Sequence, residues 1–146
     1  MGKLLAIAQR EKSKSPMIEV NTANVLFDSG VASDFRGRKR GKRQVTVLTE
    51  EAWLDSCAEM SKQMPWTTRR ANLFIRGFNL ENSTGKFLTI GSLKLEITGE
   101  LEPCNRMDEQ FDGLTKVLTP EWRGGVCCKI ISEGEIKVGD EVKLEQ

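Results

Sequence analysis

Apolar residues along the chain either alternate with polar residues or form short runs rich in β-branched residues, and both patterns are typical of strands. The clearest alternation covers residues 93–98, where Leu, Leu and Ile are separated by Lys, Glu and Thr. A strand with this pattern buries one face and exposes the other. The hydrophobic pattern predicts strands at residues 4–8, 17–20, 44–48, 73–76, 87–90, 93–98, 126–131, 135–138 and 142–144.

One segment, from about residue 50 to about residue 62, has the spacing of an amphipathic helix instead. Trp53, Cys57 and Met60 fall at positions i, i+4 and i+7, which places them on one helix face. Thr49 can cap the N-terminus, and the acidic residues that follow it favour the positive end of the helix dipole. A weaker helical pattern covers residues 108–118, so the sequence predicts one clear helix and a second, weaker one.

Two segments, residues 88–95 and 136–144, each consist of two strands joined at a glycine, Gly91 and Gly139 respectively. Glycine at such a joint suits a tight β-turn or the corner of a barrel. Many short strands, few helices and these joints favour a mostly β fold, a closed or nearly closed β-barrel. No low-complexity linker divides the chain, so we expect residues 1–146 to form a single domain.

Composition excludes several classes of protein. The 22 Lys and Arg residues nearly balance the 21 Asp and Glu residues, and the absence of histidine rules out catalysis that needs an imidazole base. The four cysteines are irregularly spaced, so neither a disulfide framework nor a zinc site is expected. No apolar run is long enough for a transmembrane helix, and the apolar stretch near the N-terminus is shorter than a signal-peptide core. We therefore expect a cytoplasmic protein without membrane contact.

The strongest local charge lies in residues 36–43, where six of the eight residues are Lys or Arg. A segment with this charge cannot be buried, so it is predicted to be an exposed loop. It is either an ordinary solvated loop or an anion site for a phosphate, a nucleotide or RNA. Nucleic acid is the less favoured ligand, because no aromatic residues alternate with the cations.

A second candidate anion site lies where the chain enters the predicted strand at residues 73–76. Thr68, Arg69, Arg70 and Asn72 supply a hydroxyl, two guanidiniums and an amide, which can hold an oxyanion with directional hydrogen bonds. The alternative is ordinary turn chemistry, in which Asn72 bonds to its own backbone.

Cys104 is the strongest candidate for a reactive residue. A proline precedes it and cannot continue a central strand, so Cys104 is expected just outside the sheet, where nearby Arg106 favours the thiolate form. Cys57 lies on the apolar face of the predicted helix and is interpreted as a core residue. At least one of Cys127 and Cys128 is also expected to be buried, because neighbours in a strand face opposite sides.

Taken together, these segments resemble the MOSC domain, the C-terminal module of molybdenum-cofactor sulfurases, which also occurs as a stand-alone protein. The similarity runs from about residue 30 to the C-terminus. It rests on the order and spacing of residues 30–34, 43–45, 69–73, Gly91, 103–104, 125–126 and 134–142. The resemblance implies a strand-rich β-barrel, in agreement with the hydrophobic pattern.

The resemblance also implies roles for particular residues. The family cysteine that matches Cys104 is the proposed sulfur carrier, or the thiolate ligand of molybdenum in members that bind the cofactor. Arg70 and Asn72 would help to hold the phosphate end of a molybdopterin-type cofactor. A thiolate suits a sulfur atom or a metal with sulfur ligands, and a guanidinium suits a phosphate monoester. We expect the cofactor-binding residues to include Thr68, Arg69 and Arg38 as well.

The sequence contains no pyridoxal-phosphate-dependent desulfurase module. Sulfur transfer or molybdenum-dependent redox chemistry would therefore depend on a partner, a cysteine desulfurase or a molybdoenzyme. Two other functions stay open. The chain can be a non-catalytic module that docks on a partner enzyme or delivers cofactor to it, or an RNA- or nucleotide-binding β-barrel that uses residues 36–43.

Overall fold

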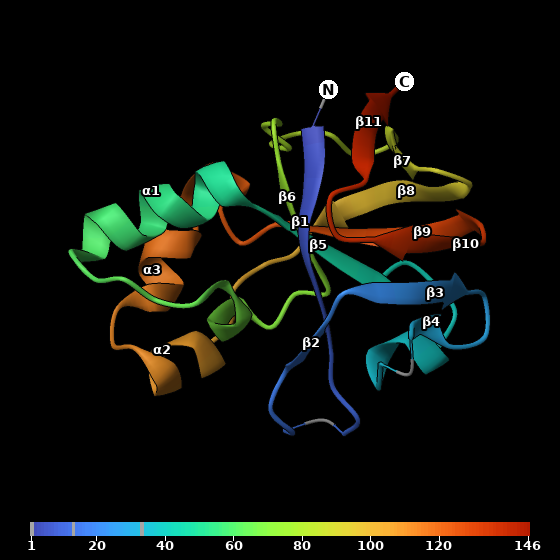
Figure 1. Ribbon diagram of the computed structural model, residues 1–146. Helices are drawn as coiled ribbons and strands as arrows, with labels where there is room; N and C mark the ends of the chain where they lie inside the picture. The colour runs from blue at the N-terminus through green and yellow to red at the C-terminus, as the bar shows by residue number, and fades with distance from the viewer. Residues whose placement is uncertain (1, 13, 33) are drawn as a thin grey trace.

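The computed structural model describes residues 2–12, 14–32 and 34–146, and it shows strands gathered in a barrel with short helices on one side (Figure 1). Ser33, within the segment 30–34, lies outside the described residues. The strands are β1 (Gly2–Gln9), β2 (Ile18–Val20), β3 (Thr22–Leu26), β4 (Gly30–Val31), β5 (Val45–Thr49), β6 (Leu73–Arg76), β7 (Phe87–Ile90), β8 (Leu93–Glu100), β9 (Val126–Ser132), β10 (Gly134–Lys137) and β11 (Glu141–Glu145). The α-helices are α1 (Glu50–Met60), α2 (Arg106–Gln110) and α3 (Leu114–Leu118), and 3-10 turns span Arg36–Arg38, Trp66–Arg69 and Pro120–Trp122.

The main sheet closes into a barrel. Its strands follow the order β11-β7-β8-β9-β5-β6-β1, and Gly2 and Lys3 of β1 then pair with Val142 and Glu141 of β11. All neighbours in this ring are antiparallel except β5 and β6, which are parallel. Closure of the ring removes free strand edges. The predicted mostly β barrel is confirmed.

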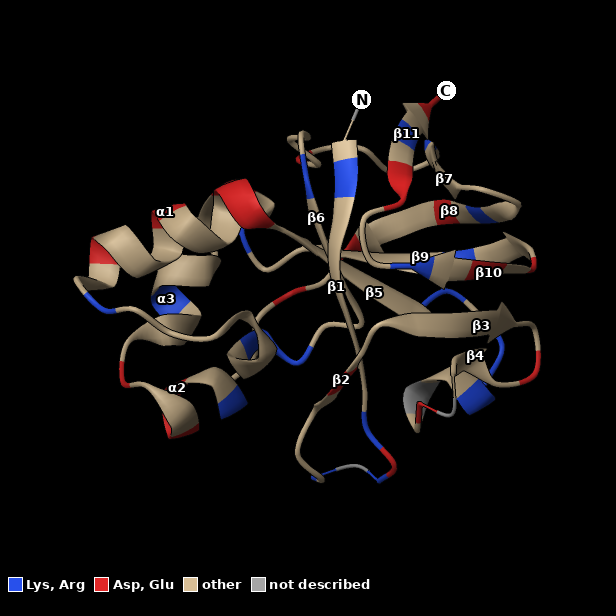
Figure 2. Ribbon diagram, in the orientation of Figure 1, with Lys and Arg blue, Asp and Glu red and all other residues tan. Residues whose placement is uncertain are grey.

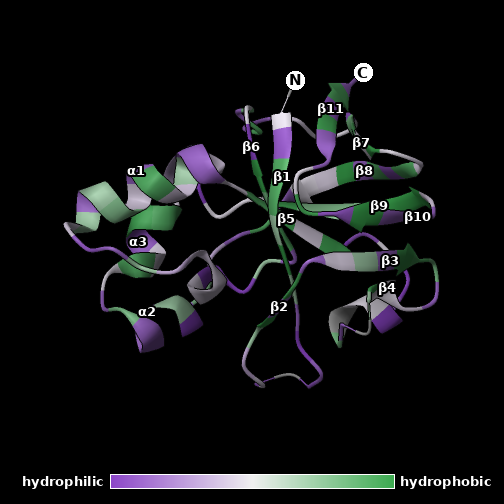
Figure 3. Ribbon diagram, in the orientation of Figure 1, coloured by the Kyte–Doolittle hydropathy of each residue, from purple (hydrophilic) through white to green (hydrophobic). Residues whose placement is uncertain are grey.

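The barrel interior is filled by the apolar residues that the alternating pattern places on one face. Leu93, Leu95 and Ile97 of β8 are buried, whereas Lys94 and Glu96 between them are partly exposed. They share one apolar cluster with inward side chains of β1, β5, β6, β7, β9 and β11. Figure 3 shows hydrophobic residues concentrated along these strands. The period of two therefore sets which face of each strand points inward.

β1 changes partner along its length. Its first residues pair with β11 and its last with β2, and a register shift between Leu4 and Ala6 interrupts its pairing with β6. A bulge of this kind bends a strand and increases its twist. The residue that follows this strand is Arg10, and it lines the cleft described below.

A smaller sheet of β10, β3 and β4 extends the same core. The hydrophobic pattern does not predict β3 or β4, because β3 mixes small and polar residues (TANVL) and β4 is only two residues long. Ala23, Val25 and Val31 are nevertheless buried and join the barrel cluster. Pairing with β10 makes β3 a strand, since its own sequence is a weak strand former.

The two glycine joints take different forms, and each is one that the sequence allows. Gly91 lies in the turn of an antiparallel hairpin between β7 and β8, with Ile90 opposite Leu93. Gly139 lies between β10 and β11, which belong to different sheets, so it forms a corner. Their φ angles are 60° and 99°, a conformation that glycine adopts without steric penalty.

Helix α1 begins where the sequence predicts. Thr49 caps it, because its Oγ1 accepts a hydrogen bond from Ala52 N at 3.2 Å. Trp53 is buried in a second apolar cluster, and Cys57 packs against the same cluster. Cys57 is therefore partly buried at the edge of this cluster and is not one of its fully buried members.

The predicted helix at residues 108–118 is wrong as a single element. α2 and α3 are separate helices, because the backbone of Phe111 is extended (φ −145°, ψ 118°) and ends α2, and α3 begins only after Gly113, whose φ is 89°. Met107 and Leu114 bring both helices into the apolar cluster that also contains α1, so tertiary packing stabilises helices of five residues each. Along the described residues, no helix is long and apolar enough to span a membrane.

Candidate functional site

A cleft of about 660 Å³ lies between the barrel and the start of α2. It is lined by the residue after β1, the end of the basic segment, the turn before β6, residues 98–104 and part of β9. Cations outnumber carboxylates among the described lining residues, and Figure 2 shows Lys and Arg at the start of α2 and in nearby loops. The charged lining residues are Arg10, Lys42, Arg43, Arg69, Arg70 and Arg106, together with Glu100 and Glu102.

Cys104 lies on the wall of this cleft and is exposed. After β8, Leu101 N donates a hydrogen bond to Gly125 O at 2.8 Å, and the chain then leaves the sheet. Cys104 O accepts hydrogen bonds from Met107 N at 2.9 Å and from Thr115 Oγ1 at 2.8 Å, which anchor the loop to α2 and α3. The expected position of the thiol, outside the sheet and exposed, is confirmed.

Arg69 lines the cleft and also holds the Cys104 loop in place. It is only 5% exposed, and its Nε donates to Gly124 O at 2.9 Å while its Nη2 donates to Leu101 O at 2.7 Å. Its Nη1 lies 3.8 Å from Met107 Sδ. These contacts fix the loop on both sides of Cys104, so Arg69 acts as a positioning residue as well as a source of positive charge.

Arg70 follows with a left-handed backbone, at a φ of 66°. For a residue with a side chain this conformation costs roughly 1 kcal/mol, and such strain is concentrated at functional sites. Its Nη2 donates a hydrogen bond to Ser15 O, and its charge acts on Arg10, which lines the same cleft. The structure thus brings together Cys104, Arg69 and Arg70 from the predicted set.

Asn72 and Thr68 are buried behind the cleft and do not line it. Asn72 Oδ1 accepts hydrogen bonds from Thr46 N at 3.1 Å and Thr46 Oγ1 at 3.2 Å, while Nδ2 donates to Ala8 O at 3.2 Å. The carbonyl of Thr68 accepts a hydrogen bond from Gln110 Nε2 at 2.9 Å. Both residues support the turn that carries the two arginines.

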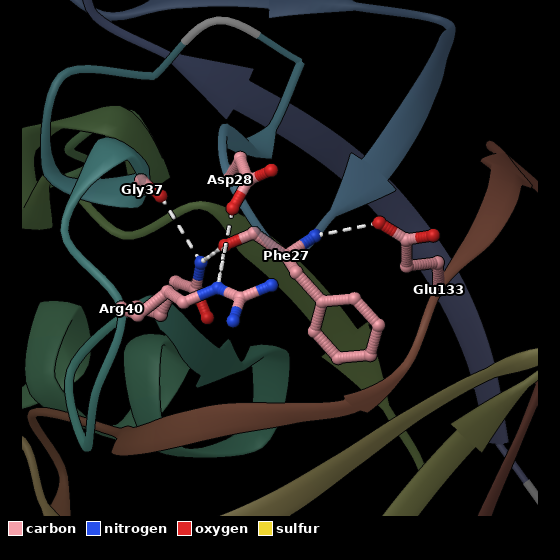
Figure 4. A network of polar contacts seen from close by, with 6 residues as sticks. Phe27, Asp28, Gly37, Arg40 and Glu133 are labelled. Carbon is pink, nitrogen blue, oxygen red and sulfur yellow. Dashed lines mark hydrogen bonds and ion pairs between the residues drawn. The ribbon is translucent and has the colours of Figure 1, made fainter.

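The basic segment 36–43 divides into two parts. Arg38 is exposed and does not line the cleft, and Arg40 is held by the turn after β3 (Figure 4). There Arg40 Nε lies 3.3 Å from Phe27 O and 3.2 Å from Asp28 Oδ1, and the guanidinium stacks over the Phe27 ring. Gln44 strengthens the attachment, since its Nε2 donates to Phe27 O at 2.5 Å. Among the side chains of the segment that the structure describes, Lys42 and Arg43 line the cleft.

Thr98 attaches those last residues to the cleft wall. Its Oγ1 lies 2.5 Å from Lys42 O and 3.1 Å from Cys127 O, so one hydroxyl joins the basic segment to β9. Lys42 and Arg43 line the cleft as a result. The charge pattern alone predicts an exposed loop. The contact between Thr98 and the Lys42 carbonyl places the last two cations of that loop at the cleft.

Arg10 is a lining residue that the sequence does not reveal, because it stands alone after the first strand. It is 7% exposed, and its backbone N donates to Asp34 Oδ1 at 2.8 Å. Its pKa is lowered, chiefly by burial and then by the charge of Arg70, with a smaller contribution from Arg106. Asp34 acts in the opposite direction. The positive charges of Arg70 and Arg106 therefore both act on the buried guanidinium of Arg10.

Glu100 carries one of the carboxyl groups that line the cleft. Its pKa is raised, chiefly by burial and then by the charge of Glu102, whereas Arg69 acts in the opposite direction. A second lining residue that the sequence analysis did not select for the site is Cys127, which is 4% exposed. The only signal for it was the alternation of adjacent residues in a strand, which predicts that Cys127 and Cys128 face opposite sides.

The arrangement combines an exposed thiol with an excess of positive charge. Guanidiniums bind phosphate through charge-assisted hydrogen bonds, and a thiol near cations has an increased tendency to ionise and react. Among the described residues, no group of three or more Cys, Asp or Glu side chains could hold a metal ion. A metal in this cleft would need ligands from its own cofactor in addition to Cys104.

A family model for the MOSC domain matches residues 28–143, which is most of the chain. The chain belongs to the MOSC domain family. The match contains the whole cleft except Arg10, and it confirms the resemblance inferred from the sequence. The comparison with curated proteins finds no match.

Several solved structures share the fold. YuaD from Bacillus subtilis is 16% identical and superposes with a TM-score of 0.82, over 99% of this chain and 96% of YuaD. YiiM from Geobacillus stearothermophilus is 13% identical, with a TM-score of 0.79 over 100% of this chain and 76% of YiiM. YiiM from Escherichia coli is 14% identical, with a TM-score of 0.75 over 99% and 70% of the two chains. At these identities the similarity shows the fold alone.

Proposed function

We propose that this MOSC domain binds the phosphate-bearing end of a molybdopterin-type cofactor in the cationic cleft. The Cys104 thiolate would face the cofactor, as a ligand of molybdenum or as the carrier of a sulfur atom. The observation that carries the proposal is an exposed thiol on the wall of a cleft in which cations outnumber carboxylates. A cysteine desulfurase or a molybdoenzyme would be the partner that supplies sulfur or receives the cofactor.

The lining residues fit such a group. Arg10 is buried beside Arg70 and Arg106, and a phosphate between these guanidiniums would replace their repulsion with charge-assisted hydrogen bonds. A thiolate is a soft ligand that accepts a sulfur atom or a metal with sulfur ligands. A bound molybdenum cofactor would supply redox or sulfur chemistry at its metal. The chain itself binds the anionic end, while Arg69 holds the Cys104 loop in position.

The test is to purify the protein from cells that make molybdenum cofactor and to measure bound molybdenum and pterin per chain. The wild type is expected to retain both. Arg70→Gln and Arg106→Gln each remove one charged partner of the phosphate, so retention should weaken by about 10- to 100-fold. Cys104→Ala should lose the metal or sulfur signal and keep part of the pterin signal.

A matched control replaces the part of the basic segment that lies outside the cleft. The triple variant Arg38→Ala, Lys39→Ala, Arg40→Ala removes three positive charges, against one in each cleft variant, but should retain cofactor like the wild type. Full retention of metal by Cys104→Ala would favour a delivery or docking module instead. A wild type that retains neither molybdenum nor pterin would contradict the proposal, as would loss confined to the triple variant, which would favour an anion or RNA site on residues 36–43.

A further inference from the structure

The cleft contains a second thiol. β9 places the adjacent cysteines on opposite faces, and Cys128 points into the barrel core, where it is fully buried. Burial raises the pKa of the Cys128 thiol far above its ordinary range, and the neighbouring Cys127 adds to this shift. Cys127 itself lines the cleft that also contains Cys104. Cys128 therefore lies in the apolar core, whereas Cys127 lies at a cleft lined by charged residues.

Access to Cys127 depends on the residue opposite it. In the register of β8 and β9, Cys127 pairs with Gly99, and directly opposite residues of antiparallel strands share a face. Gly99 has no side chain and also lines the cleft, and a Cβ built there would meet no atom within 4 Å. The pairing thus leaves space beside the buried sulfur, where any other residue would place a side chain.

Cys127 contacts the end of the strand that continues into the Cys104 loop. Cys127 Sγ lies 3.9 Å from Glu100 O, at the end of the strand that continues into the Cys104 loop. The four residues from Glu100 to Cys104 span at most about 14 Å, and both cysteines line the same cleft. Thr98 Oγ1 joins the carbonyl of Lys42 to the carbonyl of Cys127, and Lys42 lines the same cleft as the second thiol.

We propose that Cys127 is a second sulfur site, which receives a sulfur atom from a persulfide on Cys104. This proposal rests on the sulfur-carrying form of the proposed function. The Cys127 thiolate attacks the outer sulfur of the Cys104 persulfide, a new S–S bond forms on Cys127, and the Cys104 sulfur leaves as a thiolate that takes up the proton lost by Cys127. One persulfide replaces another, so the step needs no oxidant or reductant. Transfer moves sulfur from an exposed loop to a buried site, where external thiols have less access.

The test loads the protein with a cysteine desulfurase and isotope-labelled L-cysteine, followed by peptide mass spectrometry. Trypsin places Cys127 and Cys128 in one peptide, residues 124–129, so the experiment uses a Cys128→Ala background in which that peptide reports on Cys127 alone. Labelled sulfur is expected on both Cys104 and Cys127. Adding Cys104→Ala should remove the label from Cys127, because a protein donor does not reach the buried thiol directly.

A second variant tests access without removing either thiol. Gly99→Val, in the same background, places a side chain beside Cys127, so the label on Cys127 should fall while the label on Cys104 remains. Circular dichroism of each variant checks folding. Label confined to Cys104 when Gly99 is intact would overturn the transfer and leave the proposed function standing. Label on Cys127 that is independent of Cys104 would also overturn it, and absence of label from both cysteines would count against sulfur carrying itself.

Discussion

The barrel interior and the cleft beside it are built from residues of opposite character. The interior cluster is apolar, and its members on β8 are almost completely buried. The cleft gathers guanidiniums whose mutual repulsion lowers the pKa of buried Arg10 further than burial alone does, and it also contains a carboxyl group with a raised pKa. Burial stabilises the first region, whereas in the second it opposes the charged forms of the residues that are present.

The difference separates a region that contributes to stability from the region to which we assign the proposed binding. Residues in the interior contribute to folding in the absence of any ligand. Like charges in a partly buried cleft reduce stability until an anion binds, and proteins retain such arrangements at functional sites. Substitutions in the two regions should therefore separate stability from binding, as the following predictions test.

The largest effect on stability is expected from Leu95→Ala. Leu95 is completely buried at the centre of β8, so its truncation leaves a cavity and should lower the free energy of unfolding by about 2–5 kcal/mol. Urea denaturation measures the change. Leu54→Ala is the matched control, because Leu54 is 57% exposed and its truncation should change stability by about 0.5 kcal/mol or less. Equal losses in the two variants would contradict the assignment of the core.

Asn72→Ala should have the next largest effect, on stability as well. Its side chain joins Thr46 of β5 to Ala8 of β1, and removal leaves buried polar groups without these partners, at a cost of about 1–3 kcal/mol. Denaturant titration gives the value. Asn79→Ala removes an exposed asparagine with a single local hydrogen bond and should cost less. A stable Asn72→Ala protein that has lost only cofactor would instead favour direct contact between Asn72 and the ligand.

Arg106→Gln should affect anion binding and leave stability nearly unchanged, the opposite of Asn72→Ala. Arg106 is exposed on the cleft, so stability without ligand should change by about 0.5 kcal/mol or less, while anion binding weakens by about tenfold. Inorganic phosphate should therefore raise the melting temperature of the wild type more than that of the variant. Arg76→Gln removes an exposed arginine of β6 outside the cleft and should respond like the wild type. Identical phosphate responses of all three proteins would place anion binding elsewhere.

The smallest effect is expected from Glu100→Gln, and it depends on pH. The pKa of Glu100 is raised in the folded protein, mainly by burial and then by Glu102, so its contribution to stability declines as pH rises from the ordinary glutamate value of 4.5 through the raised value. The variant lacks this penalty. It should be more stable than the wild type at neutral pH, with a difference that disappears as pH falls below 4.5. Thermal melts across this range, with Glu109→Gln as a surface control, measure the effect; a difference that grows toward low pH would contradict it.

Local patterns predicted much of the fold. The alternation of residues 93–98, the Thr49 cap and the glycine at position 91 all act over a few neighbours, and the structure has the strand, the helix start and the hairpin that they predict. No local pattern predicted β3, because it becomes a strand by pairing with β10, which lies more than 100 residues later in the chain. The single helix predicted over 108–118 is interrupted by extended backbone at Phe111, which the helical spacing of the sequence does not reveal.

Local patterns in the sequence predicted only part of the candidate site. Cys104 followed from the proline before it, which ends a strand locally, and the two arginines before β6 formed a visible cluster. Arg38 was selected for its charge, yet its part of the segment lies outside the cleft, and Asn72 turned inward to join two strands. Charge and hydrogen-bonding capacity are visible in a sequence, but the direction in which a side chain points is not.

The sequence by itself determined that this is a β-barrel, a member of the MOSC family, with an exposed thiol after its longest alternating segment. Those features depend on the order of residues along short stretches. Only the tertiary structure decided that Arg10, Lys42, Cys104 and Cys127 line one cleft. The physical reason is that their proximity depends on barrel closure and strand order, which arise from pairings between distant segments and leave no local pattern.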